Sequence, residues 1–381
     1  MELRKIKTAL VGCGAISGIY LKNLKGFEII ELVGCSDIID ENAQKRADEF
    51  GIRKMTFDEI LADPTIELVV NTTAPLQHYE VAKAALLAGK SVYNEKTLCE
   101  NMEQANELIA LANEKKLFLG GAPDTFFSGS LQLARSIIDS GVIGKPIMAE
   151  AFLARYYHHE RTYEGCGKPF VFCRHGGILF DMGVYYLTAL VFLLGAVKSV
   201  AGYSTIHNPN RVYQNPKSPN YNQPMQVEST NVATGVMLFE SGVMGNITML
   251  SESAPDNSFR IYCTEGYIDL GDPNLFSSAV RIVRSNGKEE IIESSVGISG
   301  GNLRGLGVAE AMYSRLSGRE ARCNGNLCRH ILEALLGICE SGESGKIYSM
   351  TTTADRPEPF EAGEFENKER VIRWEGFYNK S

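Results

Sequence analysis

The feature that most constrains this chain is a glycine turn between a strand-like run and a helix-like run near the N-terminus. The apolar, β-prone run 7–11 leads directly into Gly-Cys-Gly-Ala-Ile-Ser, residues 12–17, and apolar residues at helical spacing follow. Gly12 permits a tight turn, Gly14 lets the backbone approach a pyrophosphate, and the small Ser17 lets the helix pack closely on the strand. The start of the helix offers free N–H groups and a positive dipole end to phosphates. The candidate cofactor-binding residues of the turn are Gly12, Gly14, Ala15 and Ile16.

An acidic residue at the end of the next strand-like run makes this turn more specific. The run 29–36 ends at Asp37, and a carboxylate about 20 residues after the glycines accepts hydrogen bonds from the adenosine ribose of a dinucleotide. The same carboxylate would repel a 2′-phosphate, and Ile38 and Ile39 follow rather than arginine, so the sequence predicts NAD rather than NADP. Asp37 could instead cap a helix over 41–50, and the two roles can coexist.

Strand-like and helix-like segments continue to alternate through the first third of the chain. Further strands are predicted at 68–71, 91–94 and 117–119, with helices at 77–88 and 101–113. Repeated strand–helix units of this length predict an α/β fold with a doubly wound parallel sheet. Ligands of such sheets bind at the carboxyl ends of the strands. The loops that follow the strands are therefore expected to meet at one crevice.

A lysine lies just after one predicted strand of this sheet. Lys96 comes two residues after the run 91–94. A lysine there points into the crevice, where it could hold a substrate hydroxyl and stabilise charge during hydride transfer. A surface lysine in a loop is the alternative.

Three blocks of sequence resemble one known family. Residues 71–78 (NTTAPLQH), 84–96 (AALLAGKSVYNEK) and 176–186 (GGILFDMGVYY) are similar to the T-P-N-x-x-H, A-L-x-A-G-K-H-V, E-K-P and G-G-G-x-L-x-D-x-G-x-H segments of the Gfo/Idh/MocA family, named for glucose–fructose oxidoreductase, inositol dehydrogenase and rhizopine catabolism. Residues 304–357 resemble the closing section of bacterial members. The resemblance covers most of the chain.

The resemblance implies two domains. Residues 1–122 would form an NAD-binding Rossmann domain, and residues 123–381 an α/β domain for substrate binding and oligomerisation, built on a large, open, mainly antiparallel sheet. The polar, Pro- and Asn-rich residues 207–224 predict a long loop. Short β-prone runs that fit the second sheet lie at 146–154, 197–206, 229–239, 243–251, 258–263 and 266–270.

The resemblance also implies a catalytic set of Lys96, Asp181 and Tyr185. Asp181 and Tyr185 are four residues apart, so on a helix they share one face. Tyr185 stands where the family usually has histidine, the expected acid/base. A phenol titrates near 10, and the Lys96 ammonium is expected to lower the pKa of Tyr185 by favouring the phenolate. In the alternative, Tyr185 only packs, and Lys96 or an ordered water carries the proton.

Further cofactor contacts follow from the resemblance, as do two departures from it. Thr73, His78, Glu95 and Lys96 are expected beside the cofactor, although His78, at the start of a helix, could be purely structural. Thr97 replaces the proline of E-K-P, and because a cis bond before a residue other than proline costs about 2.5–4 kcal/mol, a trans bond is predicted. Ala74 replaces the proline of T-P-N, which leaves the shape of that loop open.

A segment rich in histidine, cysteine and aromatic residues precedes the block 176–186. Its side chains match no zinc-binding spacing, so no metal site is predicted. A loop that faces the substrate explains the segment better, and His159 or His175 could replace the missing family histidine as acid/base. The candidate substrate-binding residues are Lys96, Tyr156, His158, His159, His175, Asp181 and Tyr185.

Composition excludes several classes of partner. The net charge is −8 and no basic tract is present, which argues against nucleic acid and anionic membranes. The longest apolar run, 187–197, is too short to span a bilayer, and the N-terminus shows no signal-peptide pattern. Nine cysteines without a C-x-x-C pair predict reduced thiols and a cytoplasmic location. The resemblance implies a homo-oligomer, a dimer or tetramer.

The resulting hypothesis is an NAD-dependent oxidoreductase. It would transfer a hydride between nicotinamide and a secondary alcohol of a sugar, cyclic polyol or glycoside, with C3 of a glucoside as one version. Two alternatives remain at this point. One is an NAD-dependent glycosidase that oxidises its substrate transiently, and the other is a non-catalytic regulator that binds NAD and sugar.

Overall fold

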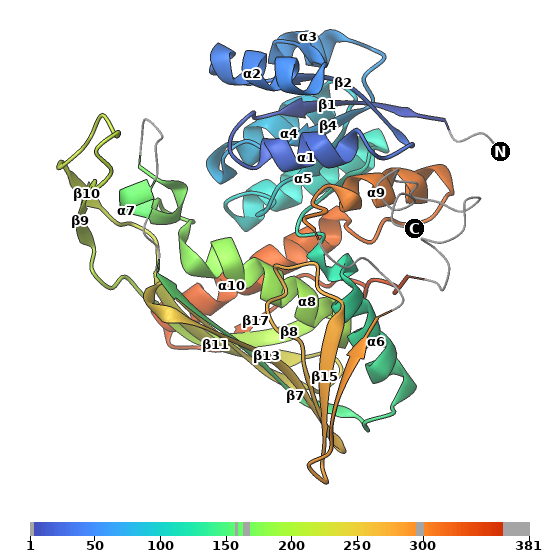
Figure 1. Cartoon of the computed structure of the whole chain (residues 1–381), viewed down its shortest axis with the longest axis vertical. Helices are drawn as coiled ribbons and strands as arrows, with labels where there is room; N and C mark the ends of the chain where they lie inside the picture. The colour runs from blue at the N-terminus through green and yellow to red at the C-terminus, as the bar shows by residue number, and fades with distance from the viewer. Residues whose placement is uncertain (1–3, 157–158, 163–167, 295–300, 361–381) are drawn as a thin grey trace.

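Two sheets organise the chain, one in each half of the sequence. The computed structural model describes residues 4–156, 159–162, 168–294 and 301–360. A parallel sheet with its helices lies at one end of the molecule and a larger open sheet at the other, with α8 (Val184–Leu194) and α10 (Gly325–Ser344) between them (Figure 1). Among the described residues, no helix combines the length and the apolar character that crossing a membrane requires.

The first sheet has six parallel strands in the order β3-β2-β1-β4-β5-β6. This is the doubly wound order of a dinucleotide-binding fold, so the predicted α/β class is confirmed. Every residue of β4 and β5 is buried, because helices cover both faces of a parallel sheet. The strands are β1 (Ile6–Val11), β2 (Ile30–Ser36), β3 (Arg53–Lys54), β4 (Leu68–Asn71), β5 (Ser91–Asn94) and β6 (Leu119–Gly121). The helices are α1 (Ser17–Leu24), α2 (Asp40–Phe50), α3 (Phe57–Ala62), α4 (His78–Leu87) and α5 (Met102–Lys115).

The second sheet has nine strands in the order β16-β15-β14-β13-β7-β12-β11-β8-β17. Its strand pairs are antiparallel except β7 with β12, which are parallel. The predicted large, mainly antiparallel sheet is therefore confirmed. The strands are β7 (Pro146–Tyr156), β8 (Val197–Thr205), β11 (Val232–Phe239), β12 (Met244–Leu250), β13 (Glu252–Cys263), β14 (Gly266–Asp269), β15 (Ala279–Arg284), β16 (Glu289–Glu293) and β17 (Tyr348–Ser349).

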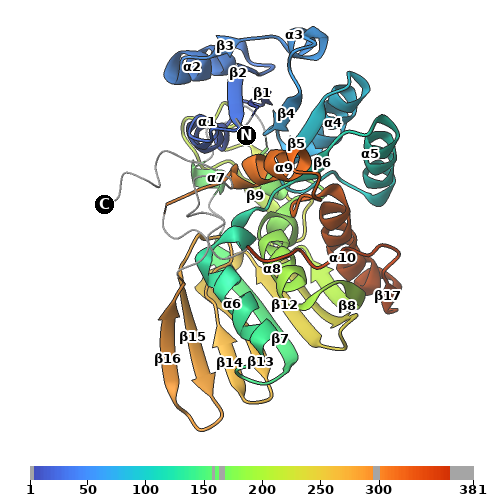
Figure 2. The same ribbon diagram turned by 90° about the vertical axis from the view of Figure 1, so that its right-hand side faces the viewer.

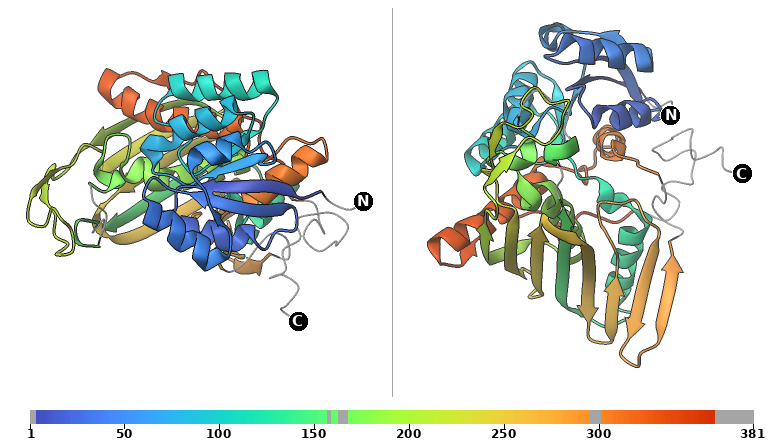
Figure 3. Two further views of the ribbon diagram at one scale, coloured as in Figure 1. Left: turned by 90° about the horizontal axis from the view of Figure 1, so that it is seen from above. Right: turned by 60° about the vertical axis from the view of Figure 1, so that its left-hand side comes forward.

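In the part of the chain that the structure describes, helices cover one face of this open sheet. In Figure 2, α6 (Gly129–Ser140) and α8 lie on the same side of the strands, and α10 contacts β8 and β11. Every residue of α8 is buried, because the helix packs against the sheet on one side and against α6 and α10 on others. Figure 3 shows the strands of this sheet fanned out side by side. Helix α9 (Leu306–Leu316) contacts α1 of the other half.

Two expectations about the second half need correction. The predicted loop 207–224 contains part of a short antiparallel hairpin, β9 (Asn210–Val212) with β10 (Pro224–Gln226). The hairpin has only three residue pairs, too few to leave a recognisable apolar alternation in the sequence. Strands β15 and β16 were not predicted: arginines at 281 and 284 interrupt the apolar residues of β15, and three of the five residues of β16 are glutamates. The short remaining elements are η1 (Pro75–Gln77), η2 (Thr125–Phe127), α7 (His159–Thr162), η3 (Phe170–Phe172) and a π-helical turn, η4 (Leu179–Gly183).

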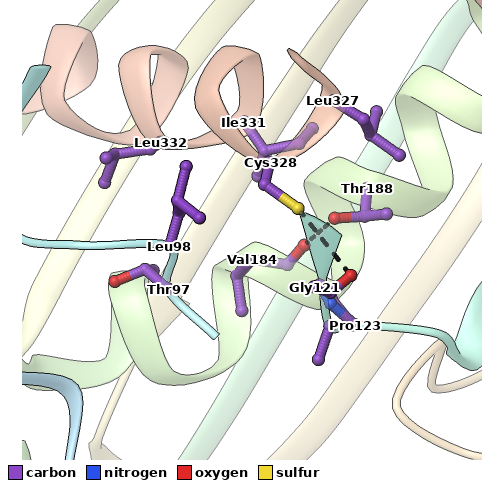
Figure 4. Close-up of a pocket in the computed structure, with 11 residues that line it drawn as sticks. Thr97, Leu98, Gly121, Pro123, Val184, Thr188, Leu327, Cys328, Ile331 and Leu332 are labelled. Carbon is purple, nitrogen blue, oxygen red and sulfur yellow. Dashed lines mark hydrogen bonds between the residues drawn. The ribbon is translucent and has the colours of Figure 1, made fainter. Parts of the chain in front are cut away.

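The two halves meet at a closely packed seam. A cavity of only about 10 Å³ remains there, between Thr97 and Leu98 of the first half and α8 and α10 of the second (Figure 4). Cys328 on α10 reaches across the seam, and its Sγ donates a 3.7 Å hydrogen bond to the carbonyl of Gly121 on β6. The closely packed seam supports the loop after β5 and so holds Lys96, which lies in that loop, in place.

Candidate active site

A cavity of about 560 Å³ opens where the loops after β1, β4 and β5 face η3, η4 and the start of α8. It brings together most of the predicted site residues. Those that line it are Gly14, Ala15, Ile16, Thr73, His78, Glu95, Lys96, Asp181 and Tyr185. The other lining residues are Thr72, Ala74, Pro75, Phe170, Met182, Asn274, Asn302 and Arg304. Gly12 and Asp37 lie just outside this lining, in and behind the glycine turn.

The glycine turn has the geometry that a dinucleotide requires. Gly12 has φ +98°, and a Cβ placed there would lie 2.5 Å from the backbone nitrogen of Thr73. A Cβ on Gly14 would meet nothing within 4 Å, so the backbone is open where a pyrophosphate approaches. The buried Ser17 donates a 2.6 Å hydrogen bond from Oγ to the carbonyl of Gly14. These residues fit the phosphates of NAD.

Asp37 is tied to the glycine turn rather than to α2. Its Oδ2 accepts a 2.6 Å hydrogen bond from the N–H of Cys13, and its Oδ1 accepts one of 2.8 Å from the N–H of Ile39. Ile39 holds the cap position of α2 without a side-chain hydrogen bond. The helix-capping alternative is therefore wrong, and the carboxylate lies at the end of β2, beside the turn.

Lys96 and Asp181 form an ion pair across the cavity. The Nζ of Lys96 lies 2.6 Å from Oδ1 of Asp181 and 2.9 Å from its backbone oxygen, and the two side chains are only 11% and 16% exposed. Burial alone would lower the pKa of Lys96, but the nearby carboxylates of Asp181 and Glu95 raise it above its usual value. The ammonium thus stays protonated, so Lys96 is a hydrogen-bond donor rather than a proton acceptor.

Asp181 lies in the π-helical turn η4 and not in a regular α-helix. The turn runs directly into α8, which carries Tyr185 in its first turn. The prediction that the two residues share one face of a helix is thus wrong in the type of helix, because the part that carries Asp181 is π-helical. Both side chains nevertheless line the cavity. π-helical turns inside helices are frequent at functional sites.

Tyr185 lies beside the ammonium of Lys96, whose Nζ is 5.5 Å from the centre of the ring. Burial raises the pKa of Tyr185, and the opposing effects of Lys96 and Arg304 do not reverse it. The predicted lowering is wrong because desolvation of the phenolate outweighs the nearby positive charges. Tyr185 is therefore a neutral phenol at rest.

Glu95 and His78 hold the loops at the rim of the Rossmann half. Glu95 accepts a 2.7 Å hydrogen bond from the hydroxyl of Tyr20 and one of 3.0 Å from the N–H of Lys96. The ring nitrogens of His78 contact the carbonyls of Thr97 at 2.6 Å and Thr73 at 3.1 Å. Burial lowers the pKa of His78. His78 thus has the structural role considered for it, and it also lines the cavity.

The peptide bond between Lys96 and Thr97 is cis, so the predicted trans bond is wrong. The carbonyl of Thr97 contacts His78, and its hydroxyl donates a 3.1 Å hydrogen bond to the carbonyl of Cys99. These buried contacts, rather than the residue type at 97, define the local backbone.

The predicted substrate loop contributes less to the cavity than expected. Tyr156, at the end of β7, is 40% exposed, and His175 is exposed with φ +60°. Neither lines the cavity, so the expected substrate contacts of Tyr156 and His175 have no support in the geometry. His158 and the side chain of His159 lie outside the described residues. Within the described ranges, no group of three or more His, Cys, Asp or Glu could hold a metal ion.

Sequence reasoning missed one wall of the cavity. Arg304 donates a 2.7 Å hydrogen bond from Nη1 to Oδ1 of Asn302, and its Nη2 donates to Oδ1 of Asn274. Its Cζ lies 5.7 Å from the ring centre of Tyr185. Phe170, from the aromatic-rich segment that was expected to face the substrate, adds an aromatic face 5.7 Å from the Nζ of Lys96. Arg304 and the two asparagines come from separate segments with no motif, and only the general resemblance of 304–357 pointed to the region.

Comparison with known proteins matches both halves of the chain. Residues 6–120 match the family model described as "Oxidoreductase family, NAD-binding Rossmann fold", and residues 131–269 match the GFO/IDH/MocA C-terminal domain. A scyllo-inositol 2-dehydrogenase (NAD(+)) of Bacillus subtilis is 27% identical over 274 residues, which cover 70% of this chain and 74% of that protein.

Other relatives are more distant or match over a shorter span. An uncharacterised oxidoreductase of Schizosaccharomyces pombe is 31% identical over 201 residues, 51% of this chain and 54% of its own length, so the chain spans about half of that relative. An NAD-binding oxidoreductase from Klebsiella pneumoniae has a TM-score of 0.80 at 20% identity, covering 91% of this chain and 100% of that one. A levoglucosan dehydrogenase in complex with NADH has a TM-score of 0.79 at 16% identity, covering 92% and 100%. At these identities, the two structures show a shared fold.

Proposed function

The chain belongs to the Gfo/Idh/MocA family of oxidoreductases, with NAD as its cofactor, and on that premise we propose that it is a dehydrogenase of a sugar, cyclic polyol or glycoside. One observation carries the proposal. The buried Lys96–Asp181 pair lies beside Tyr185 in a cavity that begins at the glycine turn.

The residues that would hold NAD follow from the open backbone at Gly14. Gly12, Gly14, Ala15 and Ile16 would bind the pyrophosphate, and Asp37 the adenosine ribose. Thr73, His78, Glu95 and Lys96 would border the nicotinamide. When bound, NAD supplies the hydride acceptor. In this proposal residues 1–122 form the cofactor domain and residues 123–381 the substrate domain.

The proton step is assigned to Tyr185, with help from Lys96. Lys96 would donate a hydrogen bond to the substrate hydroxyl oxygen, and Asp181 fixes the direction of its Nζ. In carbonyl reduction, the neutral Tyr185 would donate its proton to that oxygen. In alcohol oxidation, Tyr185 would first release its own proton to solvent, and the resulting phenolate, stabilised by Lys96 and Arg304, would then accept the hydroxyl proton.

The substrate class rests on the character of the cavity and on relatives. A cavity of about 560 Å³ has the size of a small-molecule site, and Phe170 offers an aromatic face. A scyllo-inositol 2-dehydrogenase and a D-xylose dehydrogenase are among the similar proteins, which favours a polyhydroxylated substrate. Oxidation at C3 of a glucoside is one specific version.

A homo-oligomer, a dimer or tetramer, is part of the proposal. The uncovered face of the open sheet carries Val236 and Leu238 on β11, with Leu238 opposite Met244 and Met244 opposite Met148. Val236 and Met244 are 59% and 60% exposed. A contiguous exposed apolar patch is typical of a protein interface.

A redox screen with stoichiometric protein tests the function. The protein, NAD and single compounds from a panel of inositols, free sugars and O- and C-glucosides are mixed, and reduced-nicotinamide absorbance and product masses are followed. We expect the absorbance to rise while one compound loses two hydrogens. Release of free sugar without net reduction would identify a glycosidase. No reaction, with NAD demonstrably bound, would favour a regulator.

A further inference from the structure

Arg304 is a cation in the substrate cavity whose partners among the described residues are neutral. Its side chain donates hydrogen bonds to amide oxygens of Asn302 and Asn274, and it also interacts with the hydroxyl of Tyr185. Among the described residues, no Asp or Glu forms an ion pair with it. A partly buried guanidinium carries five donors in a planar fork, and burial of a charge without an opposite charge is costly.

The other charged groups of the cavity already have partners. Lys96 is paired with Asp181 at 2.6 Å. Glu95 accepts hydrogen bonds from Tyr20 and from the backbone of Lys96. Asp124 lies behind the wall, where its Oδ2 accepts from the N–H groups of Gly305 and Gly307 at 2.8 and 3.0 Å. The charge of Arg304 is therefore available to a ligand.

The wall holds Arg304 in place before any ligand arrives. Asp124 fixes the backbone on the C-terminal side of Arg304, and the two asparagine side chains orient its guanidinium. Such preorganisation reduces the entropy that a ligand loses on binding. An arginine held in this way is suited to bidentate recognition of a carboxylate.

Resting on the proposed function, we propose that Arg304 binds a carboxylate of the substrate, so that the preferred substrates are sugar acids or carboxylated cyclic polyols. Lys96 and Arg304 lie 5.5 and 5.7 Å from the ring centre of the same tyrosine, Tyr185. The carboxylate would therefore be held close to the carbon whose hydroxyl meets Lys96 and Tyr185. Phe170, beside Lys96, would cover the ring between the two groups.

A neutral isostere separates charge recognition from shape recognition. Binding of D-glucuronate and of D-glucuronamide to the NADH-loaded protein is measured by calorimetry. We expect glucuronate to bind at least about tenfold more tightly, as a charge-assisted hydrogen bond supports. In Arg304→Gln, the preference for glucuronate should disappear, while the affinity for glucuronamide should change by less than about threefold. Arg304→Lys should keep part of the preference for glucuronate. The control is Arg284→Gln on β15, which removes a surface ion pair with Glu290 on β16. This variant should keep the full preference for glucuronate.

The outcomes are distinct. Equal affinity for the two ligands in the wild type, or an equal loss for both in Arg304→Gln, would overturn the proposal and would leave Arg304 as a partner of Tyr185 alone. NADH affinity and thermal midpoint, measured on the same samples, identify a variant that fails to fold, and Arg304→Lys then replaces it. Selective binding of glucuronate in a protein that reduces NAD with no compound would reject the proposed dehydrogenase while the carboxylate site remains.

Discussion

The two walls of the cavity are built in different ways. The cofactor wall is one continuous turn, residues 12–17, whose function depends on backbone geometry such as φ +98° at Gly12. The substrate wall combines Phe170, Asp181 and Tyr185 with Arg304, which lies more than a hundred residues further along the chain, and all four act through their side chains. In the proposed function, the first wall would bind the phosphates of NAD, and the second wall would decide which substrate is oxidised. Changes to the two walls should therefore have separable effects.

Lys96→Met should produce the largest effect, and it should act on the chemical step rather than on NAD binding. The variant loses the ammonium that contacts Asp181 and the substrate oxygen, and we expect kcat to fall by about 10²–10⁴-fold. The dissociation constant for NAD should change by less than about threefold. Steady-state kinetics and NAD titration measure the two quantities. Lys83→Met, which removes a surface ion pair with Glu107, is the matched control. Unchanged kcat in Lys96→Met would remove the lysine from the chemistry.

Asp124→Asn tests the buried carboxylate that holds the backbone next to Arg304, behind the substrate wall. Burial raises the pKa of Asp124 to about 6 from 3.8, so the folded protein holds this proton more tightly than the unfolded chain does. The stabilisation is complete below the unfolded value and is lost as pH rises through about 6. The wild type should therefore lose on the order of 3 kcal/mol relative to Asp124→Asn between about pH 4 and 7. Denaturant unfolding across that range measures it, with the exposed Asp48→Asn as control. Parallel profiles for wild type and Asp124→Asn would contradict the buried titration.

Tyr185→Phe sharpens the assignment of the proton step. Removal of the hydroxyl should reduce kcat by more than about tenfold, which is a barrier increase above 1.4 kcal/mol. NAD affinity should not change, because the ring still packs against Lys96. Tyr203→Phe, on the uncovered face of β8, is the control. A smaller loss would mean that Tyr185 only packs.

Gly12→Ala tests the cofactor wall by itself. A Cβ at Gly12 would lie 2.5 Å from the nitrogen of Thr73, so the turn must shift. Local backbone strain costs about 1–3 kcal/mol, and we therefore expect NAD to bind about tenfold more weakly. Once the protein is saturated with NAD, kcat should recover to within about threefold. Gly51→Ala is a matched control, since Gly51 also has positive φ but an added Cβ meets nothing within 4 Å. Equal NAD affinity in the two variants would contradict the close packing under the turn.

Local sequence predicted the cofactor wall well. Gly12, Gly14 and Asp37 are recognisable because each depends on short-range backbone chemistry, and the β1–α1 turn lies where the spacing placed it. The order of the parallel strands follows from the same alternation. The family resemblance then supplied Lys96 and Asp181, which the fold brings to 2.6 Å across 85 residues of sequence.

The substrate wall could not be predicted to the same depth. Arg304 follows a loop without a motif and gains its role only because Asn274 and Tyr185 lie next to it in space. The pKa of Tyr185 depends on burial that no sequence pattern reports. The cis bond between Lys96 and Thr97 is visible only in the structure, where the carbonyl of Thr97 contacts the ring of His78.

Isotope transfer tests the central claim most directly. Protein loaded with one equivalent of NAD is mixed with C-deuterated forms of the compounds from the redox screen, and the masses of cofactor and product are read together. The account predicts that each substrate oxidised transfers one deuterium to NAD in the wild type, with transfer reduced by about a hundredfold or more in Lys96→Met. Product that forms while the cofactor remains unlabelled, or equal labelling in the two proteins, would contradict hydride transfer at the Lys96–Asp181–Tyr185 site.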